Sequence, residues 1–140
     1  MLRAMTFVVS LMLAGAQATQ TPVPKGLESL QGTWSVMSVN GEAAPAGMDF
    51  TLTVTGDKYV SIQNGAVDER GTLKVDPTKK PMTIDFIITE GQDQGKTQLG
   101  LVEVTGDTVR FHLGGPGEGT RPADFTPGPG TGLIVATKKK

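Results

Sequence analysis

Carboxylates and a single histidine are the side chains of this sequence that could perform acid–base or metal chemistry. Asp68 and Glu69 are adjacent, and Asp85 follows in a later apolar stretch, so the three could approach one another in the folded chain. Glycoside hydrolases use a pair of carboxyl groups that flank the bond to be broken. A carboxylate-based hydrolase is therefore an alternative to the reading that this protein is not an enzyme.

His112 is the only histidine, and the alternation of residues 108–113 predicts that it points away from the core, on the surface. A histidine-based metal site would need further ligands at regular spacing, and the sequence has no cysteine and no such spacing near His112. Phosphate-binding glycine loops and the Gly-x-Ser-x-Gly elbow are also absent from the sequence. We therefore expect no catalytic residue, no metal site and no cofactor.

The first 18 residues have the composition of a secretory signal peptide. Arg3 precedes an apolar run over residues 4–14, and Ala16-Gln17-Ala18 fits the small-x-small rule for cleavage. The run is short for a membrane span, although an uncleaved anchor or a buried helix is the alternative. We expect a signal peptide over 1–18, a linker over 19–26, no transmembrane segment after cleavage, and export to the periplasm or the medium.

The charge of the chain argues against a nucleic-acid partner. The formal net charge is −1, and loss of Arg3 would leave 12 basic against 14 acidic residues, or −2. Three of the basic residues are the terminal lysines, so the body of the chain has no basic stripe for phosphates. The sequence identifies no protein partner.

Alternation of apolar and polar residues predicts eight β-strands joined mostly by tight turns. Residues 50–55 alternate without exception and place Phe50, Leu52 and Val54 on one face. Asn64-Gly65 is a strong hairpin signal. The expected strands are centred on Trp34, Phe50, Val60, Leu73, Phe86, Leu101, Phe111 and Val135.

Two strands are harder to orient. In 58–63 we expect Val60 and Ile62 to face the core, with Tyr59 outside or at the rim. In 96–104 the facing is ambiguous, because Leu99 and Leu101 oppose the two valines that follow.

A meander of eight antiparallel strands hides its edges best by closing into a barrel. We therefore expect an all-β chain with a single eight-stranded antiparallel up-and-down barrel over 27–138. Such a barrel is filled by side chains or holds one small ligand. In the first case it is a structural or protein-interaction domain. In the second, Phe50, Leu52, Phe86 and Phe111 would bind a small apolar or amphipathic ligand, with residues 114–132 covering the mouth.

The stretch Leu30-Gln31-Gly32-Thr33-Trp34 contains the only tryptophan. Leu27 and Leu30 fit one short helical turn, which Gly32 can end because it tolerates backbone angles that other residues avoid. Trp34 would then plug the closed end of a barrel. A buried tryptophan in another β fold is the alternative.

Several short blocks in fixed order carry a resemblance over about residues 27–138. They are Leu30-Gln31-Gly32-Thr33-Trp34, Gly56-Asp57-Lys58-Tyr59, Gly71-Thr72, Asp76-Pro77-Thr78-Lys79-Lys80-Pro81 with Thr83-Ile84-Asp85, Glu90-Gly91 with Gly95-Lys96-Thr97, Gly106-Asp107, and Arg121-Pro122 with Phe125. In this order they resemble the small exported, lipocalin-like domains of planctomycete bacteria, whose function is uncharacterised. The resemblance implies a calycin-like barrel and export, and it supplies no reaction and no ligand.

Lipocalins often place a basic side chain over the tryptophan at the base of the barrel. The resemblance offers two candidates, Lys138 and Arg121. We expect Arg121 in this place, because a planar guanidinium stacks on an aromatic ring better than an ammonium does. The predicted barrel base is therefore Gly32, Trp34 and Arg121.

Overall fold

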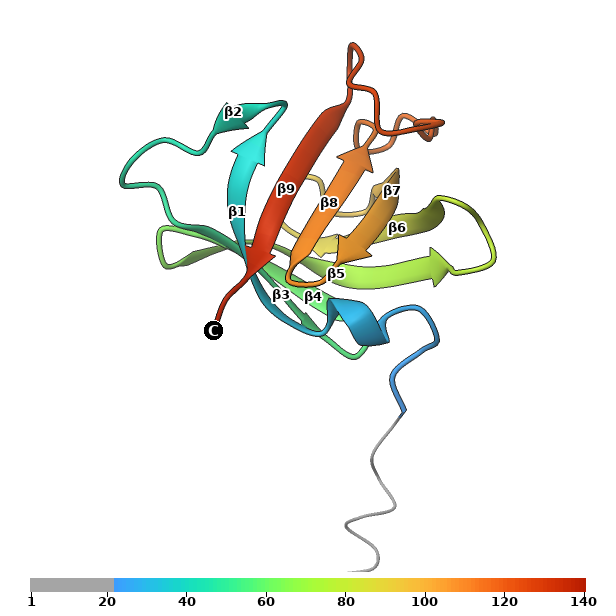
Figure 1. Cartoon of the computed structure of the whole chain (residues 1–140), viewed down its shortest axis with the longest axis horizontal. Helices are drawn as coiled ribbons and strands as arrows, with labels where there is room; N and C mark the ends of the chain where they lie inside the picture. The colour runs from blue at the N-terminus through green and yellow to red at the C-terminus, as the bar shows by residue number, and fades with distance from the viewer. Residues whose placement is uncertain (1–21) are drawn as a thin grey trace, which may run out of the picture.

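The computed structural model describes residues 22–140, so the predicted signal peptide and the start of the predicted linker lie outside the described residues. Nine antiparallel strands form one sheet, which closes through pairing of the first strand with the last (Figure 1). The strands are β1 (Gly32–Val39), β2 (Glu42–Ala43), β3 (Phe50–Thr55), β4 (Lys58–Gln63), β5 (Ala66–Asp76), β6 (Met82–Glu90), β7 (Thr97–Thr105), β8 (Thr108–Leu113) and β9 (Gly132–Lys138).

The predicted fold class is confirmed. Eight of the strands follow one another around the barrel, and the short β2 lies beside β1 outside the closed ring. A single 3-10 turn, η1 (Glu28–Leu30), precedes β1. None of the helices among the described residues is long and apolar enough to cross a membrane.

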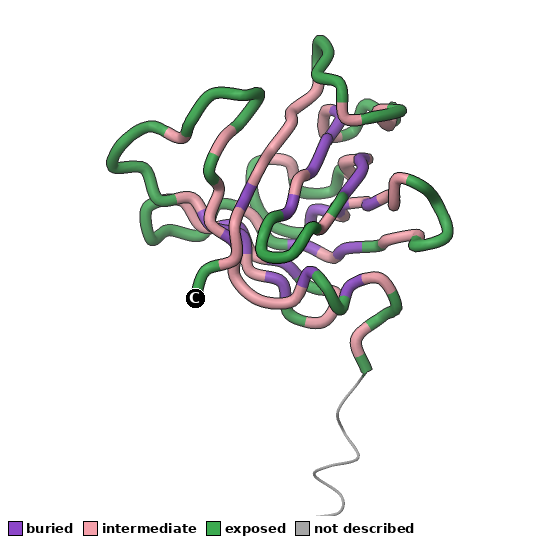
Figure 2. The backbone as a smooth tube through the Cα atoms, in the orientation of Figure 1, coloured by how far each residue is buried: buried purple, intermediate pink, exposed green. Residues whose placement is uncertain are grey.

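The two ends of the barrel differ. The β3–β4, β5–β6 and β7–β8 turns lie at one end with η1 and the C-terminus, and we call this the closed end (Figure 1). The β4–β5 and β6–β7 connections, the segment around β2 and the long β8–β9 connection lie at the other, the open end. Figure 2 shows that buried segments follow the strands, whereas turns and loop tips are exposed.

The core fills the closed end. Leu27, Leu30 and Trp34 are fully buried there. The indole Nε1 donates a hydrogen bond to the carbonyl oxygen of Leu30 at 2.9 Å, so the only polar atom of this side chain is satisfied. The side chains packed with these three include Val54, Leu73, Ile84, Val102 and Val109.

The residues next to Trp34 hold the plug in place. Gln31 donates to the carbonyl oxygen of Gly56 and accepts from its backbone N–H, both at 2.8 Å, which ties β1 to the β3–β4 turn. Gly32 has φ +113°, and a Cβ at this position would lie 3.0 Å from Cε of Lys138. The backbone angle therefore favours glycine here, and a larger residue would also have to displace the end of the Lys138 side chain.

Lys138, and not Arg121, is the basic residue over the indole. Its Nζ lies 5.2 Å from the Trp34 ring. The two residues are register partners in the β1–β9 pairing that closes the barrel, so the lysine stem starts beside the indole. Arg121 lies instead on the outer wall, where it donates to the carbonyl oxygens of Ile84 and Gly100. The expectation that Arg121 covers Trp34 is therefore wrong.

The phase of β4 is opposite to the prediction. Tyr59 and Ser61 are buried and face the interior, and Val60 and Ile62 are only half-buried. The Tyr59 ring has space because its register partner is Gly71, where a Cβ would lie 2.7 Å from Tyr59 Cε1. Across the interior, the Tyr59 ring meets the ring of Phe86 edge-on, with centroids 5.0 Å apart.

The β8–β9 connection packs on the outer wall of the barrel. His112 faces outward as predicted, but it is only 2% exposed, so the expected surface position is wrong. Its Nδ1 is hydrogen-bonded to the carbonyl oxygen of Asp124, and its Nε2 lies 2.9 Å from the hydroxyl of Thr131. Phe125 stacks beside the imidazole and lies under the guanidinium of Arg110.

The orientation of β7 follows from this packing. Val102 and Val104 belong to the interior cluster. Leu101 is the register partner of His112 and is buried on the outer side. β7 therefore has apolar residues on both faces, because its inner face packs against the core and its outer face is covered by the β8–β9 connection.

Candidate functional site

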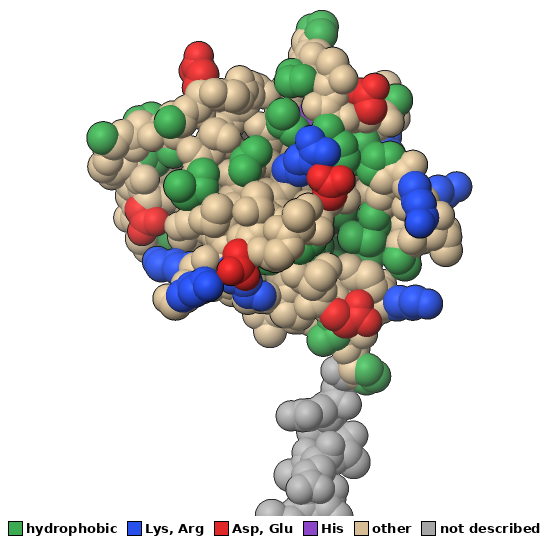
Figure 3. Space-filling view, in the orientation of Figure 1, with side chains coloured by type: hydrophobic (Ala, Val, Ile, Leu, Met, Phe, Trp, Pro, Cys, Tyr) green, Lys and Arg blue, Asp and Glu red, His purple; other side chains and the backbone are tan. Residues whose placement is uncertain are grey.

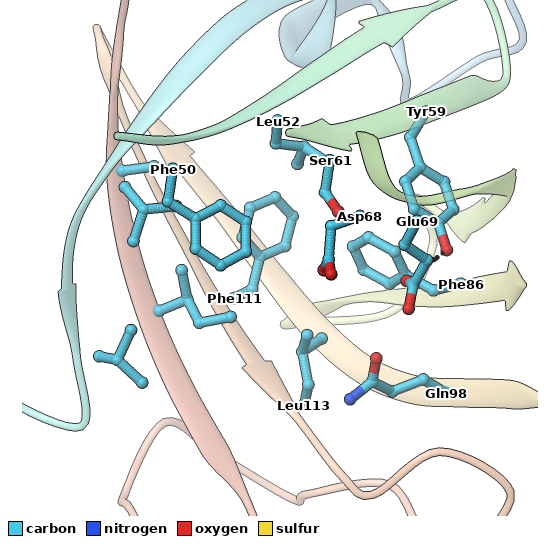
Figure 4. A pocket seen from close by; sticks show the side chains of 14 residues that line it. Phe50, Leu52, Tyr59, Ser61, Asp68, Glu69, Phe86, Gln98, Phe111 and Leu113 are labelled. Carbon is cyan, nitrogen blue, oxygen red and sulfur yellow. Dashed lines mark hydrogen bonds between the residues drawn. The ribbon is translucent and has the colours of Figure 1, made fainter. Parts of the chain in front are cut away.

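An apolar cup occupies the open half of the barrel, and Figure 4 shows the side chains that line it. Its volume is about 210 Å³, and all eight barrel strands contribute to its wall. The lining residues are Val36, Val39, Phe50, Leu52, Tyr59, Ser61, Asp68, Glu69, Phe86, Gln98, Phe111, Leu113, Ile134 and Ala136.

The structure brings all four predicted ligand-binding residues to this cup. Phe50 and Leu52 come from β3, Phe86 from β6 and Phe111 from β8. The rings of Phe86 and Phe111 meet edge-on at 5.7 Å between centroids. Strand alternation was enough to find these residues, because side chains two apart on a strand share one face.

A β-bulge in β5 adds two carboxylates that the sequence did not indicate as cup residues. Ser61 pairs with Glu69 and Ile62 pairs with Val67, so Asp68 is an extra residue on the bulged strand. As a result, consecutive side chains Asp68 and Glu69 both line the cup, and Figure 4 shows both carboxylates pointing into it. Simple alternation would have placed one of them outside.

Glu69 is held by a phenol. Tyr59 donates a hydrogen bond from its hydroxyl to Oε2 of Glu69 at 2.7 Å. Burial raises the pKa of Tyr59, and the neighbouring Glu69 raises it further, so the phenol remains protonated. Burial also raises the pKa of Glu69; the hydrogen bond from Tyr59 opposes this rise, and the charges of Asp68 and Asp93 add to it.

Two further polar side chains face the cup. Ser61 is 8% exposed, and its hydroxyl makes no hydrogen bond to another side chain or backbone group within residues 22–140. Gln98 donates one of its two amide N–H groups to the carbonyl oxygen of Gly114 at 2.8 Å, and its amide oxygen makes no hydrogen bond to another of the described residues.

A second hollow of about 430 Å³ adjoins the cup beside β2 and shares its residues Val36, Val39 and Phe50. Exposed apolar side chains of Val39 and Met48 line this hollow. None of residues 114–132 lines the cup, so the expectation that this connection covers the mouth is wrong. The rim on the β1 side is formed instead by the segment around β2.

The three carboxylates considered for hydrolysis do not converge. Asp85 lies on the outer side of β6, where Oδ1 is 2.8 Å from Nη2 of Arg121. Asp68 and Glu69 lie on the inner side of the wall. Within the part of the chain that the structure describes, no three histidine, aspartate or glutamate side chains form a group able to hold a metal ion.

The strand topology and the cup define a small single barrel of lipocalin-like architecture. Comparisons with known proteins found no matching family model, no matching curated protein and no matching solved structure. The assignment of the architecture therefore rests on the strand order of this chain and on the β1–β9 pairing that closes the barrel.

Proposed function

We propose that this barrel is a non-enzymatic binding module, exported from the cytoplasm, that holds a small apolar or amphipathic molecule in the cup. One observation carries the proposal: the open half of the barrel is lined by phenyl rings and aliphatic side chains, yet about 210 Å³ remains unfilled. An apolar cavity of about 150 Å³ holds benzene. The cup therefore suits a single ring with a short chain that extends towards the mouth.

The expected affinity for a purely apolar ligand is low. Burial of about 200 Å² of ligand surface at roughly 25 cal/mol per Å² gives about 5 kcal/mol before ordering costs. Without those costs the Kd would be roughly 0.2 mM, so a purely apolar ligand should bind more weakly than this. Tighter binding needs the polar side chains of the cup.

Two alternatives are supported less well. A structural or protein-interaction domain fits a filled barrel, whereas this interior is filled only at the closed end. A carboxylate-based hydrolase would depend on Asp68 and Glu69 alone. Hydrolases that use two carboxyl groups place them on opposite sides of the bond that breaks, and consecutive residues on one strand do not offer that arrangement.

The export of the protein and its membership of the planctomycete lipocalin-like family remain predictions from the sequence.

The cup can be tested by filling it. Ser61→Leu replaces an unpaired buried hydroxyl with an apolar side chain that occupies the cup, and Ser61→Ala removes the same hydroxyl without filling the space. Titration with phenylpropanol, followed by NMR, should show saturable binding to the wild type and to Ser61→Ala. The Ser61→Leu variant should bind at least tenfold more weakly.

The stability of the three proteins is the control in this experiment. Ser61→Leu should unfold at the same or a higher urea concentration than the wild type, because the substitution fills space and removes an unsatisfied polar group. Equal binding of phenylpropanol by all three folded proteins would refute binding in the cup. No saturable binding to the wild type would refute the proposed function as a whole.

A further inference from the structure

We propose that the cup selects small apolar molecules that carry a cationic amino group, in preference to neutral or anionic molecules of the same shape. This inference rests on the proposed function and adds the charge of the ligand. It follows from where the polar groups of the cup lie, and from which kinds of polar group are present.

The carboxylates are placed where the polar end of a ligand would lie. The β5 bulge points both Asp68 and Glu69 into the cup, across from the rings of Phe50 and Phe111 (Figure 4). A ligand whose apolar body lies among these rings would bring its polar end to the two carboxylates. The acidic pair is therefore part of the wall of a cavity and not a cluster on an open surface.

Ser61 is an independent sign that a ligand group belongs here. Its side chain is more than nine-tenths buried and points into the cup, without a hydrogen-bond partner among the described residues. A hydroxyl buried in this way costs free energy unless something fills its hydrogen-bonding capacity. A polar group of a bound molecule would satisfy it.

The polar groups of the cup mostly accept hydrogen bonds. Carboxylate oxygens accept only, one of the two amide N–H donors of Gln98 is already used by Gly114, and the phenol O–H of Tyr59 is already used by Glu69. The matching ligand is therefore one that donates several hydrogen bonds. An ammonium group has three N–H donors and no acceptor, whereas a carboxylate has no donor.

Charge gives the same preference. Among residues 22–140, no lysine or arginine lines the cup. The basic residues on the neighbouring strands and loop have acidic partners of their own, with Arg70 3.4 Å from Glu90 and Lys96 3.5 Å from Asp93. An anionic ligand would meet two carboxylates without compensation, while a cation would also be attracted by the faces of the phenyl rings.

The position of the two carboxylates near the mouth keeps the desolvation cost of binding a charged group low. Asp68 is exposed and Glu69 is half-buried, so an ammonium group beside them stays in partial contact with water. The large desolvation penalty of a fully buried ion pair is thereby avoided. The expected gain is that of a hydrogen bond to a charged group, which corresponds to about tenfold in affinity.

A series of three matched ligands tests the inference. Phenylpropylamine, phenylpropanol and phenylpropionate share one apolar body and differ in the charge at its end. At neutral pH and low salt, we expect the amine to bind the wild type about tenfold more tightly than the alcohol. The acid should bind most weakly, and added salt should reduce the preference for the amine.

Variants assign the preference to the two carboxylates. Asp68→Asn should weaken amine binding severalfold and alcohol binding by a smaller factor, and addition of Glu69→Gln, which keeps an acceptor for Tyr59, should abolish the preference. Asp57→Asn is the matched control, because it removes the same charge from an exposed turn at the closed end. This control should bind all three ligands like the wild type.

The outcomes separate the two proposals. Equal affinities for amine and alcohol, or a preference that survives loss of both carboxylates, would overturn the charge selection while leaving the cup as a binding site. If none of the three ligands shows saturable binding, both the charge selection and the proposed function fail.

Discussion

At the scale of single residues, Trp34 is the main side chain of the packed closed end by size and burial. It is the largest fully buried residue, and its N–H satisfies a carbonyl group of η1. Trp34→Ala should lower the free energy of unfolding by about 3–5 kcal/mol, because it leaves a cavity and an unpaired carbonyl oxygen. Urea unfolding followed by circular dichroism measures this, and a loss below about 1 kcal/mol would contradict the role of Trp34 as the plug.

Glu69 gives a second prediction, on pH dependence. Its pKa is raised in the folded state above the usual value of 4.5, chiefly by burial. The hydrogen bond from Tyr59 of β4 opposes this rise, and the charges of Asp68 of β5 and Asp93 of the β6–β7 connection add to it. A raised carboxyl pKa means that the folded state favours the neutral form. Its contribution to stability is therefore fully present below pH 4.5 and is lost as the pH rises through the folded-state pKa.

Glu69→Gln should remove this loss. The variant keeps an acceptor for the Tyr59 hydroxyl but cannot ionise, so its stability relative to the wild type should be higher at pH 7 than at pH 4. Urea titrations of both proteins at these two pH values test the sign, and the other titrating groups cancel in the comparison. A relative stability that falls between pH 4 and pH 7 would show that Glu69 is favoured as an anion.

The candidate site shows which residues a sequence can and cannot reveal. Phe50, Leu52, Phe86 and Phe111 could be found from alternation, because each lies on a strand with regular phase. Asp68 could not be found in this way, because its side chain points into the cup only through the β-bulge in β5. The position of that bulge is defined by the strand register of the folded sheet. Lys138 could not be chosen over Arg121 from residue type, because the β1–β9 register decides which one reaches the indole.

At the scale of elements, the β8–β9 connection is the largest departure from expectation. Its length and its glycines and prolines suggested a cover for the mouth, yet it is folded onto the outer wall of β6, β7 and β8. Arg121 holds it there through two carbonyl oxygens and the carboxylate of Asp85. His112, which has its side chain on the outer face of β8, holds it at a second place.

Arg121→Ala should release this connection. We expect a loss of about 1–3 kcal/mol in the free energy of unfolding and faster amide hydrogen exchange in residues 115–131. Trp34 emission should not change, because Lys138 is the residue over the indole. Arg70→Ala is the matched control, since it breaks an exposed pair with Glu90 that should contribute at most about 1 kcal/mol. Unchanged exchange in Arg121→Ala would contradict the anchoring role.

The strands themselves were largely predictable. All eight expected barrel strands are present, because alternation and turn residues such as Asn64-Gly65 act locally. The phase of β4 was not predictable from hydrophobicity, because the interior accepts Tyr59 and Ser61 and leaves Val60 and Ile62 half-buried. The decisive contacts of Tyr59, with Gly71 and Glu69, come from a neighbouring strand.

At the scale of the whole molecule, the charges on the surface do not indicate a particular class of partner. On the face shown in Figure 3, basic and acidic side chains are interspersed around the closed end. The cellular compartment is therefore the property that most restricts which ligands and partners the protein can encounter. The predicted signal peptide implies that N-terminal sequencing of the mature protein should begin at Thr19. Intact Met1 on protein from the cytoplasm would contradict export.

The central claim is that the barrel is packed at one end and open to a small ligand at the other. NMR chemical-shift mapping during a titration with phenylpropylamine tests this most directly. We predict saturable shifts confined to the cup, at residues such as Phe50, Ser61, Asp68 and Phe111, with no change at Trp34 or in residues 115–131. Shifts centred on the hollow beside β2 or on the outer wall, or no saturable shift at all, would contradict the account.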